Sequence, residues 1–419
     1  MLNRTLQPEL KAIDHIDFIA PVKYALNEEV SLFHMKDVAD ETCRFDLYFD
    51  AGKCRGLNGI PNFVNGLLLS GTNQKSSIQI QEEINGKGGF FESGVSIENA
   101  VISVYCLREN LWSIVETLAD AIKNTAFIEK EVNEFLSDAR QKLKINLEKM
   151  SYLAQTEFQQ RLFASHERYS NVLKLEDFDN ITMEQLKEFH TTHYLNGLSK
   201  VVVVGNVEDE LVSDIKTLFQ PMALKSPLNY ETGLKNATGE YIFDKDNAIQ
   251  TAIRLGRILF NKKHQDYLDF LVLNTILGDY FGSRLMANIR EDKGYTYGIG
   301  SMLAEIDDTG YFLIATEVRK DVREDTLNEI RFEINRLQNE LVSPAELELV
   351  QNYMLGQLLK SADGAYAMTD LFLSAEIHGK GLGFYNEAIL AIRAITPERI
   401  QELAKKYLNW DDMTIVGVG

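Results

Sequence analysis

The feature that most constrains the fold is an internal repeat. The stretch ITMEQLKEFHTTHYLNGLSKVVVVG covers residues 181–205, and ITPERIQELAKKYLNWDDMTIVGVG covers residues 395–419. Each copy begins with a Thr suited to a helix N-cap, continues as an amphipathic helix pattern, breaks at Tyr-Leu-Asn and ends as a β-branched strand. The two copies lie about half the 419-residue chain apart. Duplication of a unit of roughly 210 residues is therefore the economical explanation.

The segments between the two copies agree in outline. The first half predicts, in order, the strand CRFDLYFDAG, helices over 59–70 and 77–86, strands near 90–96 and 100–107, and helices over 109–123 and 128–149. The second half predicts the strand AIQTAIRLGR, helices over 264–279 and 283–292, strands near 295–304 and 309–318, and helices over 321–339 and 344–360. Paired strands followed by runs of helices favour an α+β fold of two homologous halves. Each half should contain an antiparallel-rich sheet covered by helices.

The organisation into domains follows from the repeat. The segment QPMALKSPLNYETGLKNATGE, residues 220–240, is polar and holds two of the seven prolines, which is typical of a linker. We therefore expect an N-terminal half over 1–219, a linker over 220–240 and a C-terminal half over 241–419.

The charge limits the range of partners. The chain has 43 Lys and Arg against 62 Asp and Glu, a formal net charge of −19. Such an acidic chain is a poor partner for nucleic acid or an anionic membrane, although it permits a basic peptide as substrate. The first residues show no signal-peptide pattern, and no apolar run approaches the roughly 20 residues of a membrane span. We expect a cytoplasmic protein that contacts neither nucleic acid nor membrane.

The cysteines point to neither a disulfide framework nor a structural zinc site. Cys43, Cys54 and Cys106 are an odd number, far apart in sequence and without C-x-x-C spacing. We interpret them as small buried hydrophobic residues.

The segment GIPNFVNGLLLSGT, residues 59–72, has the residue spacing of a metal-binding helix but lacks the ligands. Here the whole chain, from LNRTLQPEL to the terminal TIVGVG, resembles the pitrilysin-type inverted zincin metallopeptidases, specifically their processing-peptidase branch. That resemblance implies two similar α+β halves. Active members carry G-x-x-H-x-x-E-H followed by a Gly-Thr turn, in which the two His bind zinc and the Glu acts as general base.

The resemblance places the degenerate positions residue by residue. Gly59 and the Gly71-Thr72 turn match the motif, whereas Asn62 and Gly66 occupy the two His positions and Asn65 occupies the Glu position. Asp138 takes the place of the third ligand, and Glu131 lies about two turns earlier on the same face of that helix. A catalytic zinc site needs three protein ligands, so one carboxylate is not enough. We expect no metal or cofactor in this chain, and we interpret Asn62 and Asn65 as polar positions on a scaffold helix.

A second motif keeps its chemistry. In the segment SRLMANIREDKGYTYGIGS, Arg290 and Tyr297 have the spacing of the family's Arg and Tyr pair. In active relatives the Arg holds the substrate backbone and the Tyr hydroxyl donates to the carbonyl oxygen as it becomes tetrahedral. The alternative is that Arg290 is a surface charge at a helix end closed by Gly294 and that Tyr297 is a sheet residue.

A third motif is altered. Active relatives carry a Gly-x-x-x-Asn-Ala edge strand to which the substrate adds as an extra strand. Here Gly88 is kept, but Glu92 and Ser93 stand in the Asn-Ala place. These three residues are candidate substrate-binding positions, and the alternative is an ordinary edge strand in which a charge discourages aggregation.

Two further features carry less weight. His190 and His193 have metal-ligand spacing but no evident partner, so we interpret them as ordinary histidines. Gly278 and Gly282 match a flexible glycine segment of the family rather than a phosphate loop, because the G-K-[ST] ending is missing.

Together these features predict the non-catalytic subunit of a heteromeric zinc metallopeptidase. This chain would supply Arg290 and Tyr297 to the active site of an H-x-x-E-H partner, which would hold the zinc and cleave peptides. Alone, the chain should be inactive as a peptidase and could form a homodimer. The alternatives are a catalytically inactive structural or scaffold protein, or a peptide-binding protein, of the same fold.

Overall fold

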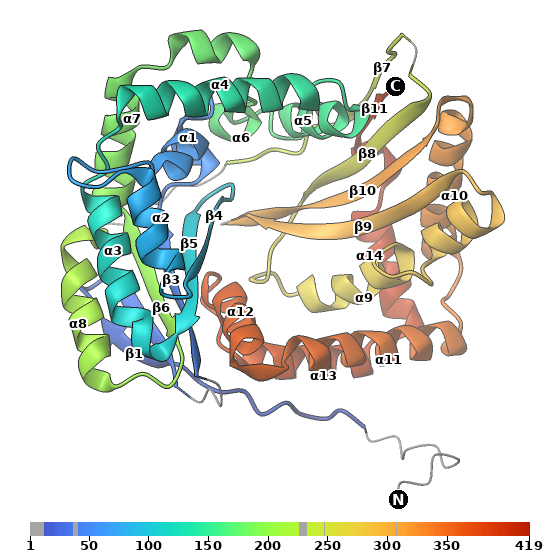
Figure 1. Ribbon diagram of the computed structural model, residues 1–419. Coiled ribbons are helices and arrows are strands. Elements are labelled where there is room, and N and C mark those ends of the chain that lie inside the picture. The colour runs from blue at the N-terminus through green and yellow to red at the C-terminus, as the bar shows by residue number, and fades with distance from the viewer. Residues whose placement is uncertain (1–11, 37–40, 226–232, 247, 307) are drawn as a thin grey trace, which may run out of the picture.

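Two β-sheets, one in each half of the chain, form the framework of the molecule (Figure 1). The computed structural model describes residues 12–36, 41–225, 233–246, 248–306 and 308–419. The predicted match at LNRTLQPEL and part of the predicted linker lie outside these residues.

Within the described residues, the first sheet has six strands in the order β1-β2-β6-β3-β5-β4 and the second has five in the order β7-β11-β8-β10-β9. The strands of the first sheet are β1 (Val22–Ala25), β2 (Ser31–Met35), β3 (Thr42–Phe49), β4 (Phe90–Val95), β5 (Ala100–Leu107) and β6 (Leu198–Val204). Those of the second are β7 (Gly239–Phe243), β8 (Gln250–Leu259), β9 (Thr296–Ile306), β10 (Thr309–Arg319) and β11 (Thr414–Val418).

The two sheets share one topology once β1 is set aside. In each, the first remaining strand pairs in parallel with the last strand of its half, β2 with β6 and β7 with β11. All other pairs are antiparallel. The predicted α+β fold of two homologous halves with antiparallel-rich sheets is thereby confirmed. The edge strands β4 and β9 both approach the centre of the molecule (Figure 1).

The predicted helices occur in the predicted order, and the structure adds further ones. The helices are α1 (Ile60–Leu67), α2 (Ser77–Asn85), α3 (Leu111–Lys123), α4 (Glu129–Asn146), α5 (Met150–Leu162), α6 (Glu167–Ser170), α7 (Met183–His190), α8 (Asp209–Phe219), α9 (Tyr267–Leu277), α10 (Arg323–Asn339), α11 (Pro344–Ser361), α12 (Gly364–Glu376), α13 (Gly383–Ala394) and α14 (Pro397–Tyr407). Of these, α5, α6, α8, α12 and α13 were not predicted. The repeat holds in detail, because Thr182 and Thr396 both accept a hydrogen bond from the first turn of their helices.

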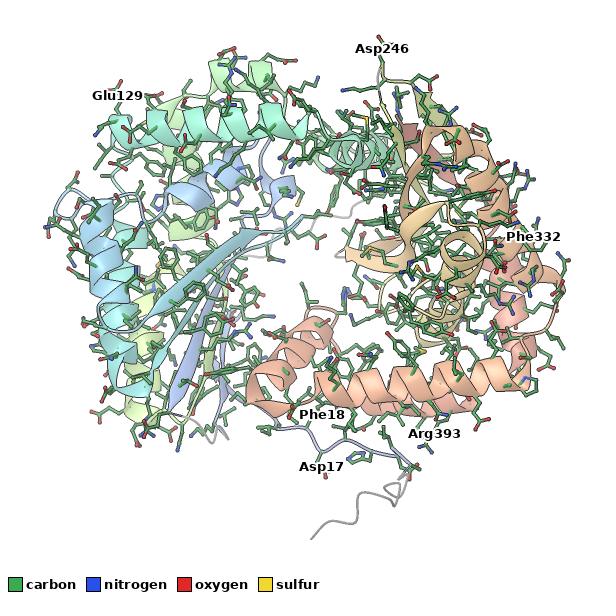
Figure 2. All side chains as sticks on the ribbon, turned by 45° about the vertical axis from the view of Figure 1, so that its right-hand side comes forward. Asp17, Phe18, Glu129, Asp246, Phe332 and Arg393 are labelled. Atoms are coloured by element: carbon green, nitrogen blue, oxygen red, sulfur yellow. The ribbon has the colours of Figure 1, made fainter. Side chains whose placement is uncertain are left out.

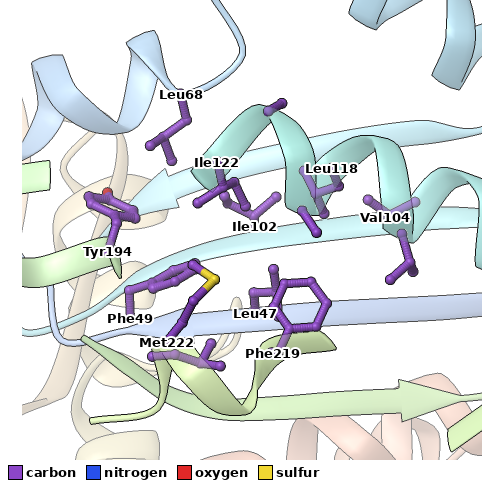
Figure 3. Packing of buried hydrophobic residues seen from close by; sticks show 14 of the residues in the cluster. Leu47, Phe49, Leu68, Ile102, Val104, Leu118, Ile122, Tyr194, Phe219 and Met222 are labelled. Carbon is purple, nitrogen blue, oxygen red and sulfur yellow. The ribbon is translucent and has the colours of Figure 1, made fainter. Parts of the chain in front are cut away.

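Each half buries its own core on one face of its sheet. In the first half, Leu118 and Ile122 of α3 pack over Ile102 and Val104 of β5 (Figure 3). In the second half, α9, α10 and α14 cover the sheet in the same way. The apolar stripe of α14 must be removed from water, and α9, which is apolar on nearly all sides, is buried almost completely.

The other face of each sheet is covered by a helix from the opposite half. Phe158 and Leu162 of α5, which belongs to the first half, pack against Leu313 and Val416 of the second sheet. The helix at the same position of the second half, α12, packs on the first sheet, where Phe372 lies edge-on to Phe33 at 4.9 Å between ring centroids. Each half thus covers one face of the other half's sheet with a helix.

Polar contacts reinforce the docking of α12 on the first sheet. The buried guanidinium of Arg44 on β3 donates to Asp46 at 2.9 Å and to Asp370 of α12 at 2.7 Å. Lys200 of β6 also pairs with Glu376 at the end of α12. These contacts fix α12 in register on the sheet.

The N-terminal segment adds a third connection between the halves. It leaves the first sheet and runs beneath α13, where Phe18 and Arg393 are labelled in Figure 2. Ile16 and Asn386 exchange two hydrogen bonds, and Arg393 pairs with Asp14. The ring of Phe18 also lies 5.8 Å from that of Tyr385.

The three cysteines are buried, as predicted for small core residues. Cys43 and Cys106 face each other across β3 and β5, and both are free thiols, as is Cys54. Burial raises the pKa of Cys43 and Cys54 to about 11 and that of Cys106 to about 12, which keeps the thiols protonated. No described helix has the length and apolar character needed to cross a membrane.

The ion pairs of Arg44 generate a first prediction. Asp46 is fully buried, whereas the side chain of Asp370 is 61% exposed. Arg44→Met would leave the buried carboxylate without its cation, so we expect the free energy of unfolding to fall by about 3–5 kcal/mol. Asp370→Asn should cost only about 0–1 kcal/mol, because water screens the exposed carboxylate. Urea unfolding would measure both losses of stability. Equal losses would contradict the claim that the buried pair of Arg44 with Asp46 contributes more than the exposed pair with Asp370.

Three buried histidines generate a second prediction. Burial lowers the pKa of His34, His190 and His193 below the usual value of 6.5. Below about pH 6.5 these three histidines bind protons more readily in the unfolded chain than in the folded chain. The free energy of unfolding therefore has its full value above that pH and declines as the pH falls. The melting temperature should drop between pH 7 and pH 5.5. His190→Asn should weaken this dependence, whereas replacing the exposed His15 should leave it unchanged, and a flat profile in the native chain would contradict the account.

Candidate functional site

The degenerate zinc helix, α1, persists because its apolar face is buried. Gly59 adopts a left-handed conformation with φ of +78° before the helix, and Pro61 lies in the first turn, where its missing N–H is tolerated. Phe63, Val64 and Leu67 are buried in the core of the first half. The helix ends at Leu67, shorter than the predicted span of 59–70, and a turn follows.

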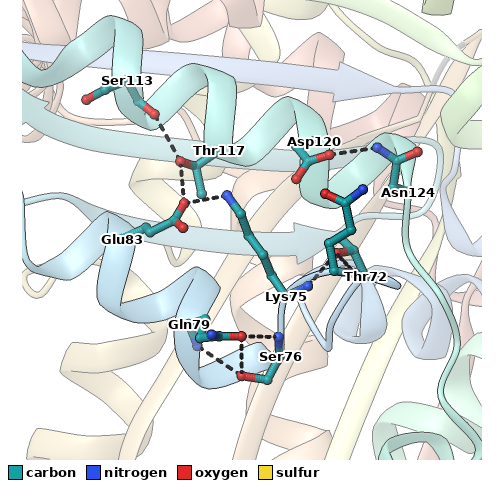
Figure 4. A network of polar contacts seen from close by, with 10 residues as sticks. Thr72, Lys75, Ser76, Gln79, Glu83, Ser113, Thr117, Asp120 and Asn124 are labelled. Carbon is teal, nitrogen blue, oxygen red and sulfur yellow. Dashed lines mark hydrogen bonds and ion pairs between the residues drawn. The ribbon is translucent and has the colours of Figure 1, made fainter.

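The Gly71-Thr72 turn after α1 is held by polar contacts rather than by metal chemistry (Figure 4). The Thr72 hydroxyl accepts from the backbone N–H groups of Gln74 and Lys75 at 3.1 and 3.0 Å. The Lys75 ammonium then binds Glu83 of α2 at 2.7 Å, and Glu83 also accepts from Thr117 of α3 at 3.0 Å. This network fixes α1, α2 and α3 relative to one another.

The three degenerate positions have different surroundings. Asn62 and Gly66 are exposed, whereas Asn65 is 7% exposed and its amide nitrogen donates to the Tyr194 hydroxyl at 3.2 Å. The interpretation of Asn65 as a simple polar scaffold position therefore needs correction. Asn65 is a buried hydrogen-bonding residue of the core, and Tyr194, which sequence reasoning missed, is fully buried beside it.

An aromatic ring occupies the place where the second zinc ligand would extend. A Cβ atom added at Gly66 would lie 2.4 Å from Cζ and 2.6 Å from Cε2 of Phe135 on α4. Any side chain at position 66 must therefore displace the ring of Phe135. Since Asn62 and Asp138 are the only polar residues left at ligand positions, the site does not fit zinc. Among the described residues, no group of three or more His, Cys, Asp or Glu side chains could hold a metal.

Two clefts flank Phe135. The strand cleft, about 330 Å³, lies between α1, α4 and the edge strand β4 and is lined by Asn65, Gly66, Ser93, Glu131 and Phe135 among others. The helix cleft, about 530 Å³, lies between α1, α4 and α5 and is lined by Asn62, Lys142, Tyr152 and Gln155 among others. Phe135 and Asp138 line both, so these two residues form the common wall.

The candidate substrate-binding strand β4 is an open edge. Gly88 precedes it with φ of +69°, and Glu92 and Ser93 are exposed, with Ser93 on the wall of the strand cleft. On the side away from β5, no described group bonds to the β4 backbone. An open edge of this kind can accept an extended peptide as an additional strand.

The corresponding edge in the second half is covered at Ile299 and Ser301. The outward N–H of Ser301 on β9 donates to the carbonyl oxygen of Gly278 at 3.1 Å, and that of Ile299 donates to Sδ of Met286 at 3.5 Å. Gly278 therefore covers the strand edge. The chain presents a free edge at β4 and a protected edge at β9.

Arg290 lies in the π-helix Met286–Asp292, which Gly294 ends with φ of +64°. Its guanidinium stacks on the ring of Phe281, with Cζ 4.6 Å from the ring centroid, and the nearest carboxylate oxygen, on Glu291, is 4.0 Å away. Phe281, between Gly278 and Gly282, is itself 64% exposed. The arginine is thus oriented by an aromatic ring and keeps its hydrogen-bond donors largely free.

Tyr297 lies on β9, as predicted, and its side chain is 94% exposed. No hydrogen bond of its hydroxyl is found among the described residues. It borders a recess of about 700 Å³ that Ile249, Glu317 and Arg319 also line, but Arg290 does not line this recess. This recess therefore does not bring Arg290 and Tyr297 together.

The two histidines of the HTTH segment are ordinary hydrogen-bonded histidines, as predicted. His190 binds the carbonyl oxygen of Ile122 at 2.8 Å, and Nδ1 of His193 binds that of Asp50 at 2.6 Å. Both are buried core residues.

Comparisons with known proteins agree with this architecture along most of the chain. The family model described as Insulinase (Peptidase family M16) matches residues 34–171, and that described as Peptidase M16 inactive domain matches residues 180–354. The "Uncharacterized zinc protease YmxG" of Bacillus subtilis (strain 168) is 23% identical over 358 residues, 85% of this chain and 87% of that protein. Human "Mitochondrial-processing peptidase subunit beta" is 23% identical over 410 residues, 92% of this chain and 81% of that protein.

A solved structure shows the same fold. The crystal structure of a peptidase M16 inactive domain from Pseudomonas fluorescens superposes with a TM-score of 0.85 at 21% identity, covering 95% of this chain and 98% of that one.

The position of Phe135 generates a third prediction. The triple variant Asn62→His, Asn65→Glu, Gly66→His should not bind zinc, because the imidazole at position 66 meets the Phe135 ring. Adding Phe135→Ala and Asp138→Glu should make room for the side chain and lengthen the third ligand, and zinc affinity should then become measurable by calorimetry. Phe332→Ala, which truncates an exposed ring far from the site, is the matched control. Stoichiometric zinc in the triple variant alone would show that Phe135 is no obstacle.

Proposed function

The chain belongs to the M16 peptidase family, and on that premise we propose that it is a non-catalytic subunit that binds peptides for an H-x-x-E-H partner of the same family. One observation carries the proposal: the ring of Phe135 closes the metal position at Gly66, while the neighbouring strand edge of β4 stays open. In this proposal the metal chemistry is lost, while the open edge of β4 remains available to a peptide although Glu92 and Ser93 replace the family's Asn-Ala pair.

The chain lacks what peptide hydrolysis needs. Neither His position nor the Glu position of the motif carries its residue, so no metal-bound water and no general base can form at α1. The chain alone is therefore inactive as a peptidase. The partner would hold the zinc, which polarises the scissile carbonyl and supplies the nucleophile, and it would provide the base.

Arg290 and Tyr297 are the residues this chain would contribute. The Tyr297 hydroxyl is exposed and has no partner within the described chain, so it can donate to a carbonyl oxygen that becomes negatively charged. The Arg290 guanidinium, held from one face by Phe281, can bind the backbone carbonyls of a peptide. Both act across an interface in this proposal, which agrees with the exposure of Tyr297 and with the half-buried position of Arg290, whose donors remain largely free.

The relatives support a two-subunit arrangement. The human relative is named as the beta subunit of a processing peptidase, so proteins of this size and family do work as subunits. Without the partner, this chain could pair with a second copy of itself and enclose a metal-free chamber.

A scaffold role is the second candidate. It is favoured by the fact that Arg290 and Tyr297 do not line one recess in the chain. A peptide-binding protein without an enzyme partner is a variant of the same alternative, and the open edge of β4 favours it.

Reconstitution generates the fourth prediction. A mixture of this chain with an H-x-x-E-H relative from the same organism should cleave peptides that neither protein cleaves well alone. Tyr297→Phe in this chain should lower the rate on the order of 10²-fold, because one donor to the developing oxyanion is lost. Arg290→Ala should chiefly raise KM.

Matched controls exist elsewhere in the second half. Arg331 also lies over an aromatic ring, with Cζ 5.6 Å from the Trp410 centroid, and Tyr353 packs against Tyr280 with the two rings tilted by 36°. Arg331→Ala and Tyr353→Phe should leave the rate unchanged. The proposal fails if the partner cleaves equally well without this chain. If the complex forms but Arg290→Ala and Tyr297→Phe have no effect, the scaffold role is correct.

A further inference from the structure

The helix cleft carries two lysines without an ion-pair partner in the described part of the chain. Lys53 and Lys142 line it, and neither has an ion-pair partner among the described residues. Asp138 is the only carboxylate on its wall. In a chain with 62 acidic and 43 basic residues, two unpaired lysines on one cleft make an anionic group the best complement.

Hydrogen-bonding groups on the same wall are also left open. Asn62 is exposed, and for its side chain and the Tyr152 hydroxyl the described residues provide no hydrogen-bond partner. Burial raises the pKa of Tyr152, so its hydroxyl remains a donor at neutral pH. The two lysines, the amide and the hydroxyl together offer donors from α1, α4, α5 and the segment before α1.

The back of the cleft is rigid, because neighbouring groups hold its amides. Gln159 donates through Nε2 to the carbonyl oxygen of Tyr169 at 2.9 Å. Gln155 accepts at Oε1 from Nε of Arg254, which lies on β8 of the second sheet, at 3.3 Å. The cleft is thus built against both halves, and a ligand that fits it meets groups already in place.

The strand cleft, on the other side of Phe135, has the opposite charge. Glu131, Glu134 and Asp138 line it, and no Lys or Arg does. An anionic group is repelled there and attracted in the helix cleft. A peptide that crosses Phe135 is therefore favoured when its anionic group lies in the helix cleft and disfavoured when that group lies in the strand cleft.

We propose that the helix cleft is a carboxylate-binding subsite for an extended peptide, with Lys53 and Lys142 as charge partners and Asn62 and Tyr152 as hydrogen-bond donors. The group bound is a free C-terminal carboxylate or an Asp or Glu side chain. The residues before it cross Phe135 and follow the open edge of β4. The inference deepens the proposed function by naming a substrate class, and it rests on that function only in taking the ligand to be a peptide.

The test uses the isolated full-length chain and fluorescence anisotropy. Three labelled peptides of one neutral sequence are compared: one with a C-terminal amide, one with a C-terminal carboxylate, and one with an amide end and a single internal Glu. We expect at least one carboxylate peptide to bind on the order of tenfold more tightly than the amide, as charge-assisted hydrogen bonds suggest. Which of the two gains affinity identifies the source of the carboxylate.

Variants tie the effect to the cleft. Lys53→Gln with Lys142→Gln should remove the preference, and Tyr152→Phe should reduce it. Lys144→Gln, an exposed lysine of α4 outside the cleft, should preserve it. If the double variant does not fold by circular dichroism, Lys142→Gln alone should still lower the ratio.

Several outcomes would overturn the proposal. They are equal binding of all three peptides, no binding of any, or a loss of preference in Lys144→Gln as large as that in the double variant. No partner enters this assay, so its failure leaves the reconstitution result intact, and failure of reconstitution leaves this result intact.

Discussion

The reciprocal exchange of helices between the two sheets is the constraint on which the rest of the structure depends. Each sheet has two apolar faces, and its own half covers only one of them. Helix α5 buries Phe158 against the second sheet, and α12 buries Phe372 against the first. Because neither sheet can release its foreign helix without exposing apolar surface, the halves hold a fixed relative position. The helix cleft exists because of this arrangement, since α5 forms one of its walls while its other face lies on β8 and β11.

The helix that resembles a zinc helix shows how a fold survives the loss of its chemistry. Its apolar side stays in the core through Phe63 and Leu67, and the turn after it is held by Thr72 and its partners. On the cleft side, the ring of Phe135 fills the space beside Gly66 that a side chain at position 66 would occupy. The result is a wall between two clefts that differ in charge, with Lys53 and Lys142 on one side and Glu131 and Glu134 on the other.

Much of this architecture could be predicted from the sequence, because it follows from local patterns. The repeat of 181–205 and 395–419 predicted two equivalent sheets, and the position of Gly294 predicted that Tyr297 begins a strand. What could not be predicted depends on contacts between residues distant in sequence. Nothing in the periodicity of α5 says which sheet it covers. The stacking of Arg290 on Phe281 was also missed, although a large aromatic residue between Gly278 and Gly282 was a visible sign. Asn65 was misread because only the fold places Tyr194 beside it.

The central claim is that this chain keeps the peptide-docking surface of its family without the metal. Its most direct test is the metal content of each subunit after co-purification with the H-x-x-E-H relative, separated under native conditions and measured by mass spectrometry. The account predicts one zinc ion on the partner and none on this chain, whether alone or in the complex. Stoichiometric zinc on the native chain would contradict it, since Asn62 and Gly66 at the two His positions leave Asp138 as the one carboxylate at a ligand position.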